Sequence, residues 1–142
     1  MKYNFENKND LNDFYMHDSY FTGFSYDYEN RQICFFCDNP YINKKFCFLF
    51  HNVILCNMQS CSFWGDGDRI LYVCLEEPSP MLNDLIEVQN GGKNLSAGSY
   101  LNKSIFFLPI VFQLNSGDVL HIICESVDIE ERPLPPEEPY VE

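Results

Sequence analysis

Short apolar runs alternate with polar segments that carry turn residues along most of the chain, a pattern that predicts strands joined by tight connections. In SYFTGFSYDY, residues 19–28, Phe24 and Tyr26 share one face of an extended chain. The polar segment ENRQ separates this run from ICFFC, residues 33–37, in which both faces are apolar. We therefore expect a β-hairpin that turns around residues 28–31.

Three further apolar regions predict strands. The longest, FCFLFHNVILC at residues 46–56, is too continuous for a half-exposed strand, so it predicts one central strand of the sheet. ILYVCLEE, residues 70–77, predicts another strand. SIFFLPIVFQL and DVLHIICESV, residues 104–114 and 118–127, flank a glycine-containing turn and predict a second hairpin. Pro109 predicts an edge position or a bulge there, because proline cannot donate to the ladder.

The remaining segments predict short helices, loops and a tail. DLNDFYM, residues 10–16, is typical of one helical turn with Asp10 as its N-cap. MLNDLIEV, residues 81–88, has apolar residues at helical spacing and predicts a two-turn helix. QSCSFWGDGDR, residues 59–69, predicts a loop. Residues 129–142 hold four prolines and five acids, so we expect them to be extended or disordered.

Together these elements predict a mainly β fold: an antiparallel sheet of hairpins, arranged as a sandwich or half-barrel, with one or two short helices. An α+β arrangement is the alternative. We expect about six or seven strands with short connections. Because 142 residues is a usual size for one domain, residues 1–128 are predicted to form a single β-rich domain. Residues 129–142 are then an acidic, proline-rich C-terminal tail.

The composition agrees with strands, since the chain holds 13 Phe and nine Tyr. There is no apolar run long enough for a membrane span, and the polar N-terminal segment has no apolar leader, so we expect a cytoplasmic protein. Seven cysteines, an odd number, and no export signal predict reduced and mostly buried thiols.

The chain is strongly acidic, with a formal net charge of −12. Residues 1–30 hold six acids and two bases (−4), and residues 125–142 hold seven acids and one base (−6). Such a field repels nucleic acid and favours cationic partners. The sequence therefore predicts a basic protein partner, with neither a nucleic-acid nor a membrane partner.

His17, Asp18 and Ser19 are the residue types of a hydrolytic triad and are adjacent in the chain. Neighbours on an extended chain point to opposite faces, so these three cannot hydrogen-bond in series. We interpret them as the start of a strand, in which Asp18 or Ser19 caps local backbone amides. The functional alternative is a polar interaction cluster that includes His17 and Asp18.

Two sets of residues could bind a metal. His17, His51 and His121 could ligate zinc if the fold brought all three together. Cys34-x-x-Cys37 resembles half of a zinc site, but residues three apart on a strand face opposite ways, which favours a structural role. We therefore predict no metal site and no cofactor, and keep the three histidines as candidates.

The segment FWGDGDR contains the only tryptophan, Trp64, followed by Asp66 and Asp68. The carboxylates are too few and too closely spaced for a calcium loop. One interpretation is a tight loop that Trp64 anchors. The other is an exposed recognition patch formed by Trp64, Asp66 and Asp68, because tryptophan is a favoured interface anchor.

The runs FYMHDSYFTGFSYD, residues 14–27, and FHNVILCNMQSCSFWGDGDRI, residues 50–70, resemble those of a group of small uncharacterised bacterial domains. Those domains open with an HDS or HDA strand start and carry an F-x-N-V…FWG segment. Some of their relatives are grouped with immunity proteins of polymorphic toxin systems. The resemblance implies a small, β-rich cytoplasmic domain without known catalysis, and it assigns no catalytic residue.

These observations predict a non-enzymatic interaction protein, with an immunity protein that binds a cationic toxin as its most specific form. The first alternative is a small metal-assisted hydrolase that uses His17, Asp18 and one or both of His51 and His121. The second is a ligand-binding β domain. The charge and the missing catalytic set favour the interaction protein.

Overall fold

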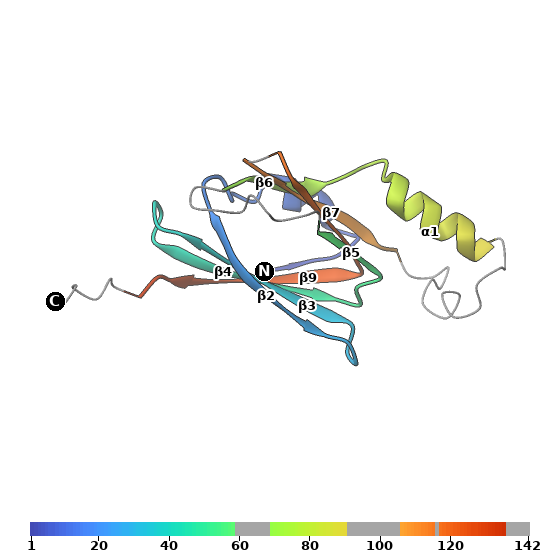
Figure 1. Cartoon of the computed structure of the whole chain (residues 1–142), viewed down its shortest axis with the longest axis horizontal. Helices are drawn as coiled ribbons and strands as arrows, with labels where there is room; N and C mark the ends of the chain where they lie inside the picture. The colour runs from blue at the N-terminus through green and yellow to red at the C-terminus, as the bar shows by residue number, and fades with distance from the viewer. Residues whose placement is uncertain (59–68, 91–105, 116, 136–142) are drawn as a thin grey trace.

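The computed structural model describes residues 1–58, 69–90, 106–115 and 117–135, which form two antiparallel β-sheets and two short helices (Figure 1). The larger sheet has the strand order β1-β9-β4-β3-β2, and the smaller has the order β5-β8-β7-β6. This confirms the predicted mainly β class with antiparallel hairpins.

The strands of the larger sheet are β1 Lys2–Tyr3, β2 Tyr20–Asp27, β3 Gln32–Asn39, β4 Lys44–His51 and β9 Ser126–Pro133. Those of the smaller sheet are β5 Leu55–Met58, β6 Ile70–Leu75, β7 Leu108–Leu114 and β8 Val119–Cys124. A 3-10 helix, η1, spans Lys8–Asp13, and α1 spans Pro80–Asn90. In the described residues no helix is long and apolar enough to cross a membrane.

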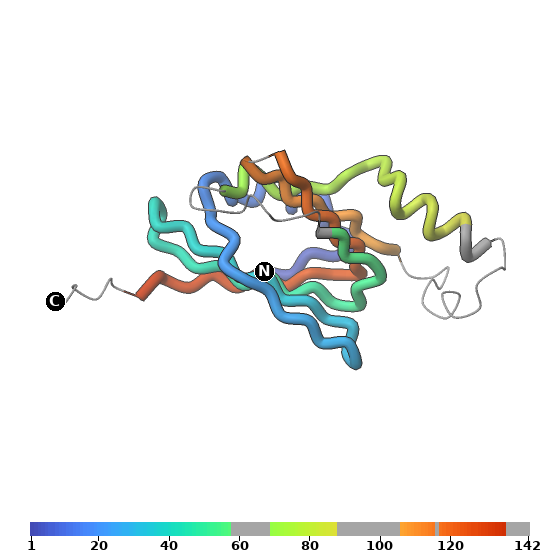
Figure 2. Tube along the Cα trace, in the orientation of Figure 1, coloured from blue at the N-terminus to red at the C-terminus, as the bar shows by residue number. Residues whose placement is uncertain are grey.

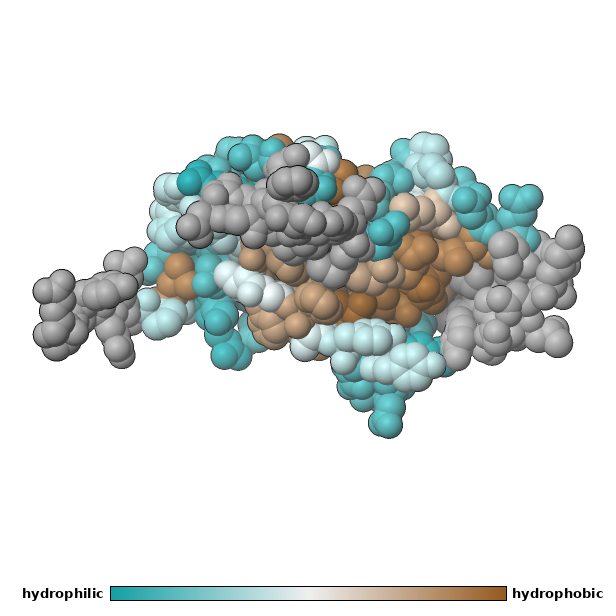
Figure 3. Space-filling model, in the orientation of Figure 1, coloured by the Kyte–Doolittle hydropathy of each residue, from teal (hydrophilic) through white to brown (hydrophobic). Residues whose placement is uncertain are grey.

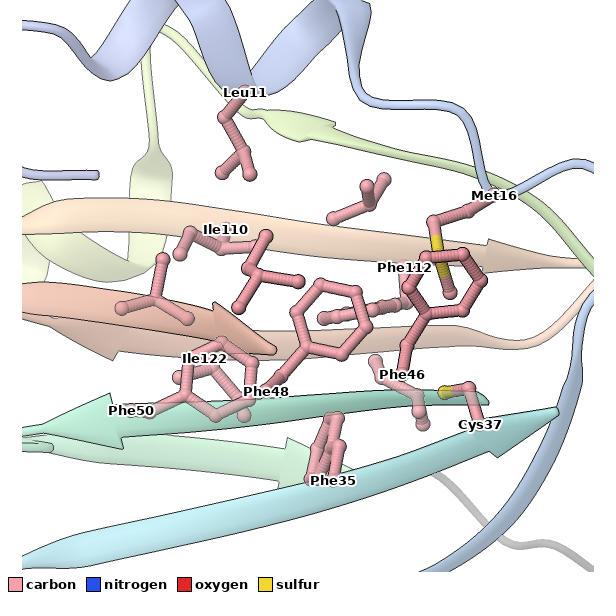
Figure 4. Close-up of a cluster of buried hydrophobic side chains, with 14 of the residues drawn as sticks. Leu11, Met16, Phe35, Cys37, Phe46, Phe48, Phe50, Ile110, Phe112 and Ile122 are labelled. Atoms are coloured by element: carbon pink, nitrogen blue, oxygen red, sulfur yellow. The ribbon is translucent and has the colours of Figure 1, made fainter. Parts of the chain in front are cut away.

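The core lies between the two sheets and is built around phenylalanine rings (Figure 4). Phe35 on β3 and Phe48 and Phe50 on β4 point inward because alternate residues of a strand share a face. Phe112 on β7 meets them from the smaller sheet, with its ring centroid 5.3 Å from that of Phe48. Leu11 of η1 is fully buried in the same cluster.

Both predicted hairpins are present. β2 and β3 pair around residues 28–31, and β7 and β8 pair around the NSGD turn. Gly117 in this second turn has a φ of 94°, a conformation that glycine adopts without steric cost. The predicted helix at residues 81–88 is confirmed as part of α1.

The prediction of one strand across residues 46–56 is wrong, because this run forms β4 and β5 in different sheets (Figure 2). Asn52, between them, has a φ of 51°, which interrupts the extended conformation. The backbone N–H of Ile54 then donates to Ile123 of the smaller sheet. Burial within β4 also alternates, so its outward residues, including Leu49, are half-exposed.

Pro109 does not mark an edge strand, because β7 lies between β8 and β6 inside the smaller sheet. The β6–β7 ladder ends at the pair Leu75 and Ile110, next to Pro109, and the backbone N–H of Glu76 just beyond β6 donates to the Pro109 carbonyl. The irregularity in that ladder lies at Ile70 and Tyr72, at the opposite end. Proline is tolerated at this position because the missing N–H falls where the β6–β7 ladder ends.

The predicted boundary at residue 129 is corrected by β9, which runs through it to Pro133. β9 pairs with β4 over its whole length, and Ile129 is buried in the core. The acidic residues of this segment indicate a solvated tail, but a strand with alternating residues can bury one face and expose the other face to solvent. The N-terminal helix also starts earlier than predicted, with Asn7 instead of Asp10 at its N-cap position.

Candidate binding groove

An apolar groove of about 330 Å³ opens where the edge strand β2 faces the edge strand β5. Figure 3 shows apolar residues gathered between the two layers on this side of the molecule. The groove is lined by aromatic residues of β2, one residue of β3 and the segment that enters β5: Phe24, Tyr26, Ile33, Val53, Ile54, Leu55 and Cys56.

The two aromatic rings of β2 are exposed although they lie on the inward side of the larger sheet. Phe24 pairs with the buried Phe35 of β3, yet 54% of its surface is accessible. Tyr26 is 57% exposed. The smaller sheet covers Phe35 but leaves these two rings open, so the groove has a wall of large accessible apolar surface, which marks interaction sites.

Carboxylates lie near the β2–β3 turn, at one end of the groove. The β2–β3 turn carries Asp27, Tyr28 and Glu29, and the Tyr28 ring packs edge-on against Tyr26 at 6.2 Å between centroids. The side-chain amide of Asn30 donates to Asp27 at 2.7 Å, which lowers the pKa of the Asp27 carboxyl and favours its charged form.

Near the same turn, where the backbone N–H of Val53 donates to the carbonyl of Arg31, Glu125 accepts a hydrogen bond of 3.0 Å from the side chain of Asn52. Asn52 directly precedes the groove residue Val53. Arg31, next to the β2–β3 turn, is the base closest in sequence to the acidic pair of that turn. The residues around this turn therefore include three carboxylates, at Asp27, Glu29 and Glu125, and one guanidinium, although Asp27 alternates with Tyr26 along β2 and so lies on the outward face.

This arrangement suits a cationic chain that also carries apolar side chains. Exposed aromatic faces beside carboxylates attract ammonium and guanidinium groups through cation–π and ionic interactions. Val53 and Leu55 offer apolar contacts at the same time. Within the described residues β2 pairs only with β3, so its other edge presents backbone groups to which an extended segment can add as a strand.

The predicted candidates His17 and Asp18 lie elsewhere, at the start of β2. Nε2 of His17 is 3.6 Å from the Asp18 carboxylate, and Nη1 of Arg69 is also 3.6 Å from it. The Arg69 guanidinium packs over the rings of Tyr20 and Tyr41. Asp18 thus joins a charged cluster that links the segment before β2 to the residue before β6. The predicted capping of local backbone amides by Asp18 or Ser19 stays a prediction.

Ser19 is separated from this cluster. It is fully buried, and its hydroxyl accepts a hydrogen bond of 3.2 Å from the side chain of Asn39. The same amide donates to the carbonyl of His17 at 3.1 Å. The three adjacent residues therefore form no triad, and Asn39 fixes the turn into β2 from the end of β3.

The three histidines have different partners on different elements. His51 on β4 places Nε2 2.6 Å from the Asp128 carboxylate on β9 and Nδ1 3.2 Å from the Gln32 amide. Nδ1 of His121 on β8 lies 3.8 Å from the carboxylate oxygen Oε2 of Glu76. In the part of the chain that the structure describes, no three His, Cys, Asp or Glu side chains are grouped to hold a metal ion.

Cys34 and Cys37 lie on opposite faces of β3, as their spacing predicts: Cys37 is buried in the core and Cys34 is half-exposed. The six described cysteines are all free thiols. Burial raises the pKa of Cys37 and of Cys124 well above the usual range. Trp64, Asp66 and Asp68, the predicted recognition patch, lie outside the described residues.

The sequence pattern does not predict the groove. Its two walls come from Phe24 and Tyr26 on one side and residues 53–56 on the other, which are distant in the chain. The aromatic residues and acids around the β2–β3 turn are visible in the sequence, but charged side chains are common on edge strands and do not by themselves indicate a groove. No known family model, curated protein or solved structure matches this chain.

Proposed function

We propose that this chain is a non-catalytic binding protein whose groove between β2 and β5 receives a basic, partly apolar, extended segment of another protein. The observation that carries the proposal is the placement of exposed aromatic rings beside carboxylates at one hairpin. Phe24, Tyr26 and Tyr28 are all more than half exposed, and Asp27 and Glu29 lie between and beside them. These groups provide both kinds of contact that a lysine or arginine side chain makes.

The overall charge supports the same class of partner. At −12 the chain attracts a cationic protein over distances comparable to the Debye length, about 8 Å at physiological salt. Attraction of this kind raises association rates more than it raises affinity, and salt weakens it. Binding is therefore expected to be fast and sensitive to ionic strength.

The most specific form of the proposal is an immunity protein that neutralises a basic toxin. It is supported by the resemblance of residues 14–27 and 50–70 to domains grouped with such proteins. The first of these segments includes Phe24 and Tyr26, and the second includes Val53–Cys56. Both walls of the groove therefore lie in the segments that carry the resemblance.

A fluorescent peptide of alternating arginine and leucine, long enough to span β2, provides a direct test by fluorescence anisotropy. A peptide in which glutamate replaces arginine controls for apolar binding alone. The site variants are Tyr26→Ala and the double variant Asp27→Asn/Glu29→Gln. Their matched controls are Tyr72→Ala, an exposed tyrosine of β6, and Asp84→Asn, an exposed acid of α1.

Tyr26→Ala removes a cation–π contact and apolar surface, about 1–2 kcal/mol together, so affinity should fall about 5- to 30-fold. The double variant removes two exposed carboxylates whose ion pairs with the peptide are screened by solvent, so affinity should fall by several-fold at most, with a weaker salt dependence. Equal losses in Tyr72→Ala and Asp84→Asn, or equal binding of the glutamate peptide, would contradict the proposal.

A further inference from the structure

Cys34 on β3 and Cys47 on β4 bring their sulfur atoms to 2.8 Å of each other. The ladder pairs Cys34 with Leu49 and Phe36 with Cys47, so the two cysteines are diagonal neighbours on the outward face of the larger sheet. Both are half-exposed, in contrast to the buried Cys37. No other pair of cysteine sulfurs is in contact among the residues that the structure describes.

We propose that Cys34 and Cys47 form a redox-active dithiol, which a small-molecule disulfide such as oxidised glutathione converts into an intramolecular disulfide. This modification site does not depend on the proposed function, because it lies on the opposite face of the sheet from the groove residues Ile33 and Phe24.

The reaction proceeds by two exchanges. The thiolate of one cysteine attacks a sulfur of the glutathione disulfide, whose S–S bond breaks, and one glutathione leaves as a thiolate. The other cysteine, also as a thiolate, attacks the protein sulfur of the mixed disulfide and releases the second glutathione. The two thiol protons pass to the glutathione thiolates, so the cysteine pair loses two electrons and one glutathione disulfide becomes two glutathione molecules.

Geometry favours the second exchange over release of the first glutathione. A disulfide bond is about 2.05 Å long, so the two sulfurs need to approach by less than about 1 Å from their present separation. The strands that carry them are paired from residues 33–39 to residues 44–50, which holds the two side chains side by side. Attack within the protein therefore competes well with external glutathione.

The environment sets the rate of the exchange. Burial, together with the hydrogen bond to Cys47, raises the pKa of the Cys34 thiol to about 12. Only a small fraction of Cys34 is then ionised at neutral pH, and the thiolate is the attacking species. Disulfide formation should be slow near neutrality and accelerate as the pH rises.

The test uses the full native chain with oxidised glutathione at mildly alkaline pH, followed by acid quenching, alkylation, trypsin digestion and mass spectrometry. Trypsin releases Cys34 and Cys37 in residues 32–44, and Cys47, Cys56 and Cys61 in residues 46–69. Fragmentation of the linked peptides therefore has to identify the bonded sulfurs.

The expected product joins Cys34 to Cys47 with the loss of two hydrogens and carries no glutathione on either residue. Cys34→Ser and Cys47→Ser should each stop at a mixed disulfide on the remaining cysteine, whereas Cys56→Ser, a change at an exposed cysteine of β5, should retain the link. The proposal is overturned if native wild-type protein yields only mixed disulfides, or links through Cys37, Cys56 or Cys61.

Discussion

Replacing Phe112 with alanine should destabilise the fold more than any change in the groove, because this ring joins the two sheets. It is fully buried on β7, and its centroid lies 5.4 Å from Phe35, 5.3 Å from Phe48 and 6.1 Å from Phe50. Truncation removes the buried ring and leaves a cavity that three aromatic neighbours cannot fill. Such changes cost about 3–5 kcal/mol, a large part of the about 5–15 kcal/mol that stabilises a typical domain.

Urea denaturation followed by circular dichroism measures this loss as a lower midpoint at an unchanged slope. Phe24→Ala is the matched control, since the same substitution at a ring that is 54% exposed should cost about 1 kcal/mol or less. Equal destabilisation by the two variants, or a loss below about 1 kcal/mol for Phe112→Ala, would refute the described packing of the two sheets.

Three further changes test other parts of the structure. Asn39→Ala removes the buried donor to Ser19. The polar groups left without a hydrogen bond should lower the free energy of unfolding by about 1–3 kcal/mol, as measured by urea denaturation. Ile129→Ala should cost about 2–4 kcal/mol in the same assay if β9 is a core strand; a neutral result would place this residue in a solvated tail. Burial raises the pKa of the Cys37 and Cys124 thiols in the folded state, so just above the ordinary thiol pKa of 9.0 these thiols lose their protons only in the unfolded state. Stability should therefore be full below that pH and fall above it by up to about 1.4 kcal/mol per pH unit for each thiol, and Cys37→Val should reduce this slope; an unchanged slope would contradict the burial of Cys37.

The strands could be predicted where local pattern decides the conformation. β2, β3, β7 and β8 each combine β-favouring residues with a polar turn between partners, so both hairpins follow from the sequence. The division of residues 46–56 could not be predicted, because the apolar run continues from β4 through the bend at Asn52 into β5. A run of apolar residues indicates that a segment is apolar enough to be buried, but it does not indicate which sheet covers each residue.

At β9 the prediction failed in the other direction, because a segment expected to be a solvated tail is a core strand. Its acids and the prolines from Pro133 onward are typical of a solvated tail, yet Val127 and Ile129 alternate with residues on the outward face and complete the core beside β4. The groove was beyond sequence analysis for a different reason, since it exists only because the edge of β2 meets the start of β5. A site assembled from two distant edges depends on the sheet packing, which local propensity does not determine.

The most direct test of the proposed binding function is an NMR titration of isotopically labelled protein with the arginine–leucine peptide. The groove assignment predicts that amide shifts concentrate in residues 24–29 of the β2 hairpin and in residues 53–56, and that they diminish as salt is added. Shifts confined to the outward face of the larger sheet, around Phe36 and Leu49, or the absence of any shift at saturating peptide, would contradict it.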